Sequence, residues 1–139
     1  MDISVEQVQA NSPITIMKLD GELDASCYKD VIAKTQELYE DGTRNLILDM
    51  SDLSFMASSG LISLYNMAFI MRGEHMPDAN AGWSVLHEIR DEISNTTAAE
   101  ANFKLLSPQP RILKTLQMTG FDKLISQFDS REEALNSFN

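Results

Sequence analysis

The chain opens with two short runs in which hydrophobic and polar residues alternate. Residues 3–8 and 14–19 each have the pattern of a strand, and Asn11-Ser12-Pro13 between them has the composition of a tight turn. The two runs are therefore predicted to pair as a hairpin. Asp20-Gly21-Glu22 is predicted to end the second strand.

Hydrophobic residues then recur at intervals of three and four, which is the period of a helix with one buried face. This pattern predicts a helix over about 26–39 that ends at Asp41-Gly42, where a glycine suits the C-terminal turn. The continuous apolar run 46–48 predicts a central strand covered on both faces, with Asp49 at its carboxyl end. A second helix is predicted over about 59–72, and it is apolar on more than one side.

The segment 73–101 is irregular and is treated as an insertion with loop and helical parts. Within it, a modest amphipathic stripe is formed by Trp83, Leu86, Ile89 and Ile93. The favoured interpretation is that this stripe covers the surplus apolar side of the preceding helix. The alternative is a second partner surface or a homodimer contact.

The C-terminal part repeats the alternation of strand and helix. Residues 103–106 predict a strand, Pro110 suits the first position of the next helix, and Gly120 ends that helix. Leu124, Ile125 and Phe128 suggest an edge strand, and Ser130 to Glu133 forms a capping box before a terminal helix. The chain is therefore predicted to be one α/β sandwich over 1–139, with a mixed sheet of four to five strands and about four helices.

The composition narrows the classes of function. The 21 acidic and 11 basic residues give a formal net charge of −10, which opposes binding to nucleic acid or to an anionic membrane. The acidity suits either a basic partner surface or simple solubility. No window approaches the roughly 18 consecutive apolar residues of a membrane span, and the acidic start lacks the features of a secretion signal. A cytoplasmic location is expected.

The residue types needed for catalysis are poorly represented. Cys27 is the only cysteine and falls within the first predicted helix, so it is interpreted as a buried, inert thiol. The only histidines, His75 and His87, lie in the irregular segment. Gly-x-Ser-x-Gly and the nucleotide-binding glycine motifs are missing from the sequence, and no spacing suggests a metal site. We therefore expect neither an enzyme nor a cofactor.

The most informative segment is Ala57-Ser58-Ser59-Gly60, between a predicted strand and a predicted helix. Ser58 is a candidate for the N-cap, where its hydroxyl would accept a hydrogen bond from a helix N–H, and Gly60 would allow a close turn. Structural capping is one reading of this serine. The other is that a helix N-terminus can hold a phosphate, so that Ser58 is a suitable acceptor of one.

Four segments in order carry a family resemblance: Gly21-Glu22-Leu23-Asp24, Leu46-Ile47-Leu48-Asp49, the run from Leu53 to Leu61, and the tail from Leu116 through Leu135. Together they resemble the STAS domain, which occurs in bacterial anti-sigma-factor antagonists and in the tails of sulphate transporters. The Ser-Ser-Gly-Leu element with its preceding Asp-x-Ser-x-Leu-x-Phe is the more specific part. The Gly-x-Leu-Asp element alone would be weak.

The resemblance implies a phosphorylation-controlled switch. In antagonists of this family, the serine at the position of Ser58 is phosphorylated by an anti-sigma factor that is a serine kinase, and a PP2C-type phosphatase reverses the modification. Ser59 is the second choice of acceptor. The expected partner-binding residues are Asp24, Ala57, Ser58, Ser59, Gly60 and Leu61, and the resemblance implies that the Asp24 loop lies near Ser58. The unphosphorylated form is expected to bind the anti-sigma factor and so to free the sigma factor.

One departure from the family pattern bears on this expectation. The aspartate that usually precedes the phosphorylated serine is replaced by Ala57. Its loss could ease phosphorylation, weaken recognition by the kinase, or mark a switch that has been abandoned. The alternative function is therefore a STAS scaffold or regulatory subunit that binds a protein or a small ligand without switching.

Overall fold

A computed structural model describes residues 1–10, 12–73 and 100–138 of the chain. In this part, five strands form one sheet in the order β1-β2-β3-β4-β5. The strands are β1 (Asp2–Gln9), β2 (Pro13–Leu23), β3 (Leu46–Met56), β4 (Phe103–Leu106) and β5 (Gln127–Phe128). The helices are α1 (Tyr28–Glu40), α2 (Ser58–Met71), α4 (Pro110–Thr119), α5 (Phe121–Leu124) and α6 (Arg131–Asn136).

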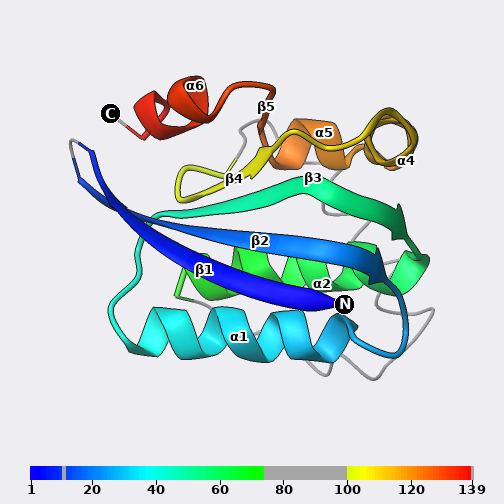
Figure 1. Cartoon of the computed structure of the whole chain (residues 1–139), viewed down its shortest axis with the longest axis horizontal. Helices are drawn as coiled ribbons and strands as arrows, with labels where there is room; N and C mark the ends of the chain where they lie inside the picture. Colours follow the sequence, from blue (N-terminus) through cyan, green and yellow to red (C-terminus); the bar gives the residue numbers. More distant parts are fainter. Residues whose placement is uncertain (11, 74–99, 139) are drawn as a thin grey trace.

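The sheet is mixed, as the sequence predicted. β1 runs antiparallel to β2, whereas β2, β3, β4 and β5 are mutually parallel neighbours. In Figure 1, α1 and α2 lie side by side beneath the sheet, and α6 lies on its opposite side near β4 and β5. Because β2 and β3 are parallel, both strands end at the same edge of the sheet, next to the start of α2.

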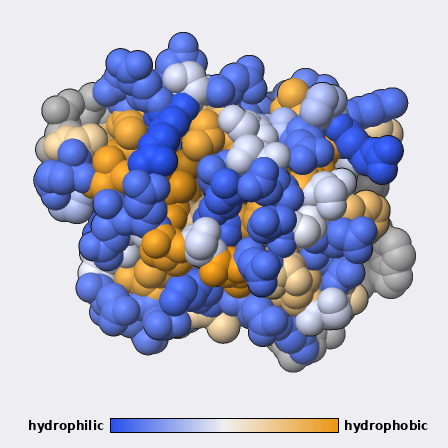
Figure 2. Space-filling model, viewed as in Figure 1, coloured by the Kyte–Doolittle hydropathy of each residue, from blue (hydrophilic) through white to orange (hydrophobic). Residues whose placement is uncertain are grey.

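Successive side chains along the strands point to opposite faces of the sheet, so the buried residues form two clusters. The main cluster takes every second residue of the central strands together with the inner faces of α1 and α2, and includes Met17, Leu19, Leu46 and Leu48. The intervening residues Ile14, Ile16, Ile47 and Leu106 face the other way and form a smaller cluster with Ala134 of α6. Figure 2 shows apolar side chains interspersed with polar ones where the β1–β2 hairpin and the C-terminal residues lie.

Most of the predicted elements are confirmed. The hairpin, the central strand, the strand over 103–106 and the main helices form where the hydrophobic pattern placed them. At α6 the predicted Ser130 cap is confirmed: the Glu133 backbone N–H donates to the Ser130 hydroxyl over 3.4 Å. Gly120 ends α4 in the left-handed conformation, with a φ of 84°.

Two predicted strand ends are wrong. β2 does not stop at Asp20-Gly21-Glu22 but continues to Leu23, because shifts of register and the φ of +121° at Gly21 absorb the irregularity. β3 likewise runs on to Met56, so Asp49 lies within the strand and not at its carboxyl end. The polar residues of this extension are exposed, which is why the hydrophobic pattern did not reveal it.

Cys27 and the last predicted strand also differ from the prediction. Cys27 lies just before α1 as its N-cap, half-buried, with its thiol 3.2 Å from the Glu22 carbonyl oxygen, so it is not a buried helix residue. Leu124 belongs to the short helix α5, which leaves only Gln127–Phe128 as the edge strand. The stripe beginning at Trp83, and both histidines, lie outside the described residues. None of the described helices is long and apolar enough to cross a membrane.

Candidate functional site

Ser58 occupies the first helical position of α2, directly after the central strand, and its side chain is exposed. The N-cap is Ala57, whose backbone is extended with a φ of −82° and a ψ of 175°, so the prediction of Ser58 as N-cap is wrong. An alanine cannot accept a hydrogen bond through its side chain, and the helix start has no side-chain cap. The Ser58 hydroxyl is therefore not required for capping.

The neighbouring hydroxyl has a different environment. The Oγ atom of Ser59 is buried and has no hydrogen-bond partner within the described ranges. Ser58 and Ser59 are adjacent in the sequence, but Ser58 is exposed whereas Ser59 is half-buried. The two candidate phosphate acceptors are thus distinguished by accessibility.

Gly60 brings the first turn of α2 very close to the ends of two strands. A Cβ atom at this position would lie 2.4 Å from Cγ of Met56 and 3.2 Å from Cδ2 of Leu23. The role of Gly60 is therefore close packing within a helix, and not the turn that the sequence suggested. Leu61 is only 7% exposed and belongs to the main core. Of the expected partner-binding residues, Gly60 and Leu61 thus face the interior.

The loop that carries Asp24 lies beside the start of α2. Leu23 pairs with Met56 in the sheet, and the Ala57 backbone N–H donates to the Leu23 carbonyl oxygen over 2.9 Å. These contacts place Asp24 next to the residue that precedes Ser58. The structure therefore brings together two segments that are far apart in sequence, as the family resemblance implied.

Asp24 is held in its charged form by local hydrogen bonds. Its Oδ1 atom accepts from the Ser26 hydroxyl over 2.5 Å and from the Ser26 backbone N–H over 2.9 Å. These bonds favour the carboxylate and lower the pKa of Asp24, with the hydroxyl making the larger contribution. The site thus keeps a fixed negative charge to a lower pH than an ordinary aspartate would.

Replacing Ser26 with alanine is expected to raise the pKa of Asp24 toward its ordinary value, because the hydroxyl donor is lost. The Asp24 carboxylate should then become protonated at a higher pH during acid titration. Carboxyl carbon shifts followed by NMR measure this directly. Ser54→Ala is the matched control, since the Ser54 hydroxyl donates to the Gly21 carbonyl oxygen. An Asp24 pKa that is the same in Ser26→Ala and in the wild type would contradict the assignment.

The surface around these strand ends is acidic. Asp20 and Glu22 on β2 are exposed, and Asp52 on β3 pairs with Lys18 over 2.9 Å. The hydrogen bond and the charge of Asp52 raise the pKa of Lys18. The N-terminal ammonium also acts on Asp24. The carboxylates of Asp20, Glu22, Asp24 and Asp52 outnumber this ammonium and Lys18, so the edge has a net negative character.

The exposure of Phe55 was missed by the sequence analysis. Its side chain is 42% exposed, although Leu53 and Met56 on the same strand are buried. In the sequence, Phe55 stands in an apolar stretch and reads as part of the core. The only sequence feature that could have indicated this exposure is Ser54, which interrupts the apolar run.

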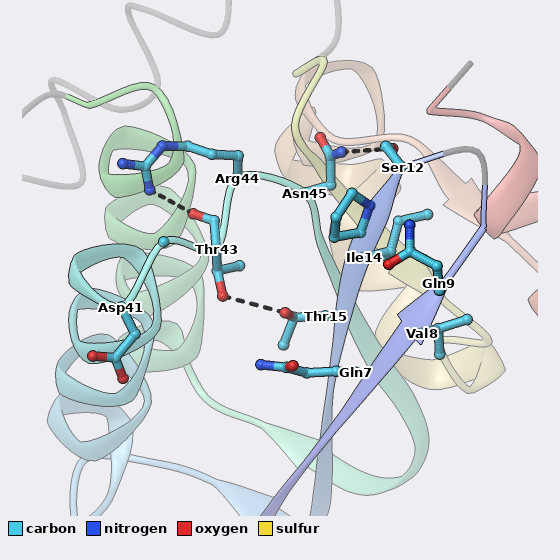
Figure 3. A pocket seen from close by; sticks show the side chains of 12 residues that line it. Gln7, Val8, Gln9, Ser12, Ile14, Thr15, Asp41, Thr43, Arg44 and Asn45 are labelled. Atoms are coloured by element: carbon cyan, nitrogen blue, oxygen red, sulfur yellow. Dashed lines mark hydrogen bonds between the residues drawn. The ribbon is translucent and has the colours of Figure 1, made fainter.

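A hollow of about 600 Å³ lies at the other end of the central strands, between the β1–β2 hairpin and the loop after α1 (Figure 3). Its polar walls largely pair with one another. The Thr15 and Thr43 hydroxyls lie 3.2 Å apart, and the Asn45 amide donates to the Ser12 hydroxyl over 3.1 Å. Since these groups satisfy each other and lie at the opposite end of β3 from Ser58, the hollow is separate from the candidate site.

Comparison with known proteins identifies the relatives of this arrangement. The family model of the STAS domain matches residues 6–68, a range that contains both the Asp24 loop and Ser58. A search among curated proteins gave no significant match. The resemblance seen in the sequence is thus confirmed by the family model over the N-terminal part of the chain.

Solved structures extend the likeness to nearly the whole chain. A putative anti-sigma factor antagonist from Thermotoga maritima has a TM-score of 0.71 at 16% identity, covering 98% of this chain and 93% of its own. An anti-sigma factor antagonist from Mycobacterium paratuberculosis has a TM-score of 0.65 at 16% identity, covering 99% and 94%. The Bacillus cell fate determinant SpoIIAA in its phosphorylated form has a TM-score of 0.58 at 22% identity, covering 99% and 100%. The fold predicted from the sequence is confirmed.

Proposed function

We propose that this chain, which matches the STAS domain over residues 6–68 and has the fold of anti-sigma factor antagonists, is itself such an antagonist. In its unphosphorylated form it binds an anti-sigma factor that is also a serine kinase. Phosphorylation of Ser58 by that kinase ends the binding, and a PP2C-type phosphatase restores it. The protein acts in the bacterial cytoplasm as a binding switch and has no catalytic activity of its own.

The observation that carries this proposal is the exposed serine at the start of a 14-residue helix. A helix N-terminus stabilises negative charge through its dipole and its backbone N–H groups, so the fold tolerates a phosphate there. The buried hydroxyl of Ser59 favours Ser58 as the acceptor, because a kinase must reach the oxygen that it modifies. Accessibility therefore supports Ser58 as the proposed acceptor.

Phosphorylation lowers the affinity for the partner and leaves the fold of the protein unchanged. Phosphorylation adds between one and two negative charges at a surface that must be desolvated when the partner binds. A kinase that has just modified Ser58 holds its nucleotide phosphates opposite this residue, so like charges face one another. A desolvated charge without a partner costs several kcal/mol, and affinity falls accordingly.

A second candidate function is a STAS scaffold that binds a protein without switching. The observation in its favour is Ala57, which replaces the carboxylate that usually precedes the modified serine. The two candidates make opposite predictions for phosphorylation. The scaffold keeps its partner whatever the charge of residue 58.

The test is phosphorylation by the kinase whose gene neighbours that of this protein. Incubation of the purified chain with this kinase and ATP should add one phosphate, as seen by intact-mass spectrometry. The phosphate should be lost in Ser58→Ala and kept in Ser59→Ala, which is the matched control. A phosphate that persists in Ser58→Ala, or that maps to another residue, would favour the scaffold.

A further inference from the structure

The end of β3 presents an exposed aromatic ring close to the proposed switch residue. Large hydrophobic side chains are exposed at four described positions, which are Met1, Val5, Phe55 and Met118. Within the described ranges, Phe55 is the aromatic member of this set. Aromatic side chains at the centre of an interface commonly contribute most of its binding energy.

The backbone around Phe55 is held on both sides. Phe55 pairs in the sheet with Glu22, and the next pair, Leu23 with Met56, is buried. The Ser54 hydroxyl donates to the Gly21 carbonyl oxygen over 3.0 Å, which ties β3 to β2 at this point. Met56 in turn packs where Gly60 approaches the strand. A ring on such a fixed backbone loses little conformational freedom when a partner covers it.

The charges beside the ring indicate the kind of partner. Glu22 lies opposite Phe55 in the register, Asp20 and Asp24 belong to the same edge, and Lys18 is engaged by Asp52. The whole chain has a formal net charge of −10. A complementary surface therefore combines an apolar pocket for the ring with a rim of lysine or arginine side chains.

We propose that Phe55 is the apolar anchor of the partner-binding surface, and that it enters a pocket with a basic rim on the anti-sigma kinase. This inference rests on the proposed function and adds a residue that determines affinity. The two parts of the surface have separate roles. The basic rim faces the carboxylates of β2, whereas the nucleotide of the kinase faces Ser58, so a phosphate on Ser58 meets other phosphates and not the rim.

The test compares binding of single variants to the purified kinase by surface plasmon resonance. Phe55→Ala should raise the dissociation constant by about 30-fold or more, mainly through faster dissociation. Glu22→Gln should mainly slow association, and the slowing should shrink in high salt. Val5→Ala is the matched control, since Val5 is 37% exposed but lies in the middle of β1. The Val5→Ala variant should bind the kinase with the affinity of the wild type.

The outcomes separate the inference from the proposed function. Affinity of Phe55→Ala within about twofold of the wild type, with binding still lost in Ser58→Asp, overturns the anchor and leaves the switch in place. A wild-type protein that does not bind the kinase overturns both. Phe55→Tyr keeps the ring and should bind the kinase with an affinity within a few-fold of the wild type. This second variant tests the anchor even where Phe55→Ala loses affinity through altered folding.

Discussion

Replacing Ser58 with aspartate is expected to raise the dissociation constant for the anti-sigma kinase by about 100-fold or more. The new carboxylate stands at an exposed helix start, where the dipole favours it, but it must lose its water when the kinase docks. The free energy of unfolding should change by less than about 1 kcal/mol, because no packed or capping group is removed. Titration calorimetry with the kinase and urea unfolding of the free protein measure the two effects.

Ser58→Asn is the control that separates charge from shape. Asparagine has nearly the size of aspartate but no charge, so it should bind the kinase much more tightly than Ser58→Asp does. Equal losses in the two variants would show that size, and not charge, determines binding. A loss of several kcal/mol of stability in Ser58→Asp would contradict the division between interface and fold.

Replacing Gly60 with alanine is expected to destabilise the protein by about 1–3 kcal/mol, because it overpacks a closed interface. In an exposed helix the same change is normally stabilising by about 1 kcal/mol. Here the new Cβ would lie 2.4 Å from Cγ of Met56, which is not the flexible end of that side chain. Urea unfolding of the variant and the wild type gives both the sign and the size of the effect.

The cause can be tested with a double-mutant cycle. Met56→Ala removes the atom nearest to the new methyl group, so Gly60→Ala should cost less in that background than in the wild type. Leu23 still lies 3.2 Å away, and the rescue is therefore expected to be partial. A stabilising Gly60→Ala, or a cost that is unchanged in Met56→Ala, would disprove the steric explanation.

The periodic hydrophobic pattern was sufficient to predict most of the helices and strands. The run 46–48 is buried on both faces of the sheet, and α2 is buried on nearly all sides, so in both cases burial and pattern agree. The capping box at Ser130 was readable because its hydrogen bond joins residues that are close in sequence. Structural features that depend on residues close together in the chain can thus be predicted from one sequence.

The sequence failed where structure depends on distant contacts. β3 continues through the exposed residues Ser51, Asp52 and Ser54 because β2 pairs with it, and no hydrophobic signal marks that pairing. Ser58 looked like the N-cap, but Ala57, which is extended and whose backbone N–H donates to the Leu23 carbonyl oxygen, takes that place, so the helix starts one residue earlier, at Ser58. The closeness of Asp24 to this helix start came from the family resemblance and not from the residues themselves.

The central claim is that the charge of residue 58 controls docking while the fold stays unchanged. The most direct measurement compares the enzymatically phosphorylated protein with the unmodified protein, using titration against the same kinase. We predict an affinity at least about 100-fold weaker for the phosphorylated form, with the same melting temperature within a few degrees. Equal affinities of the two forms, or a phosphorylated protein that unfolds much more readily, would contradict the account.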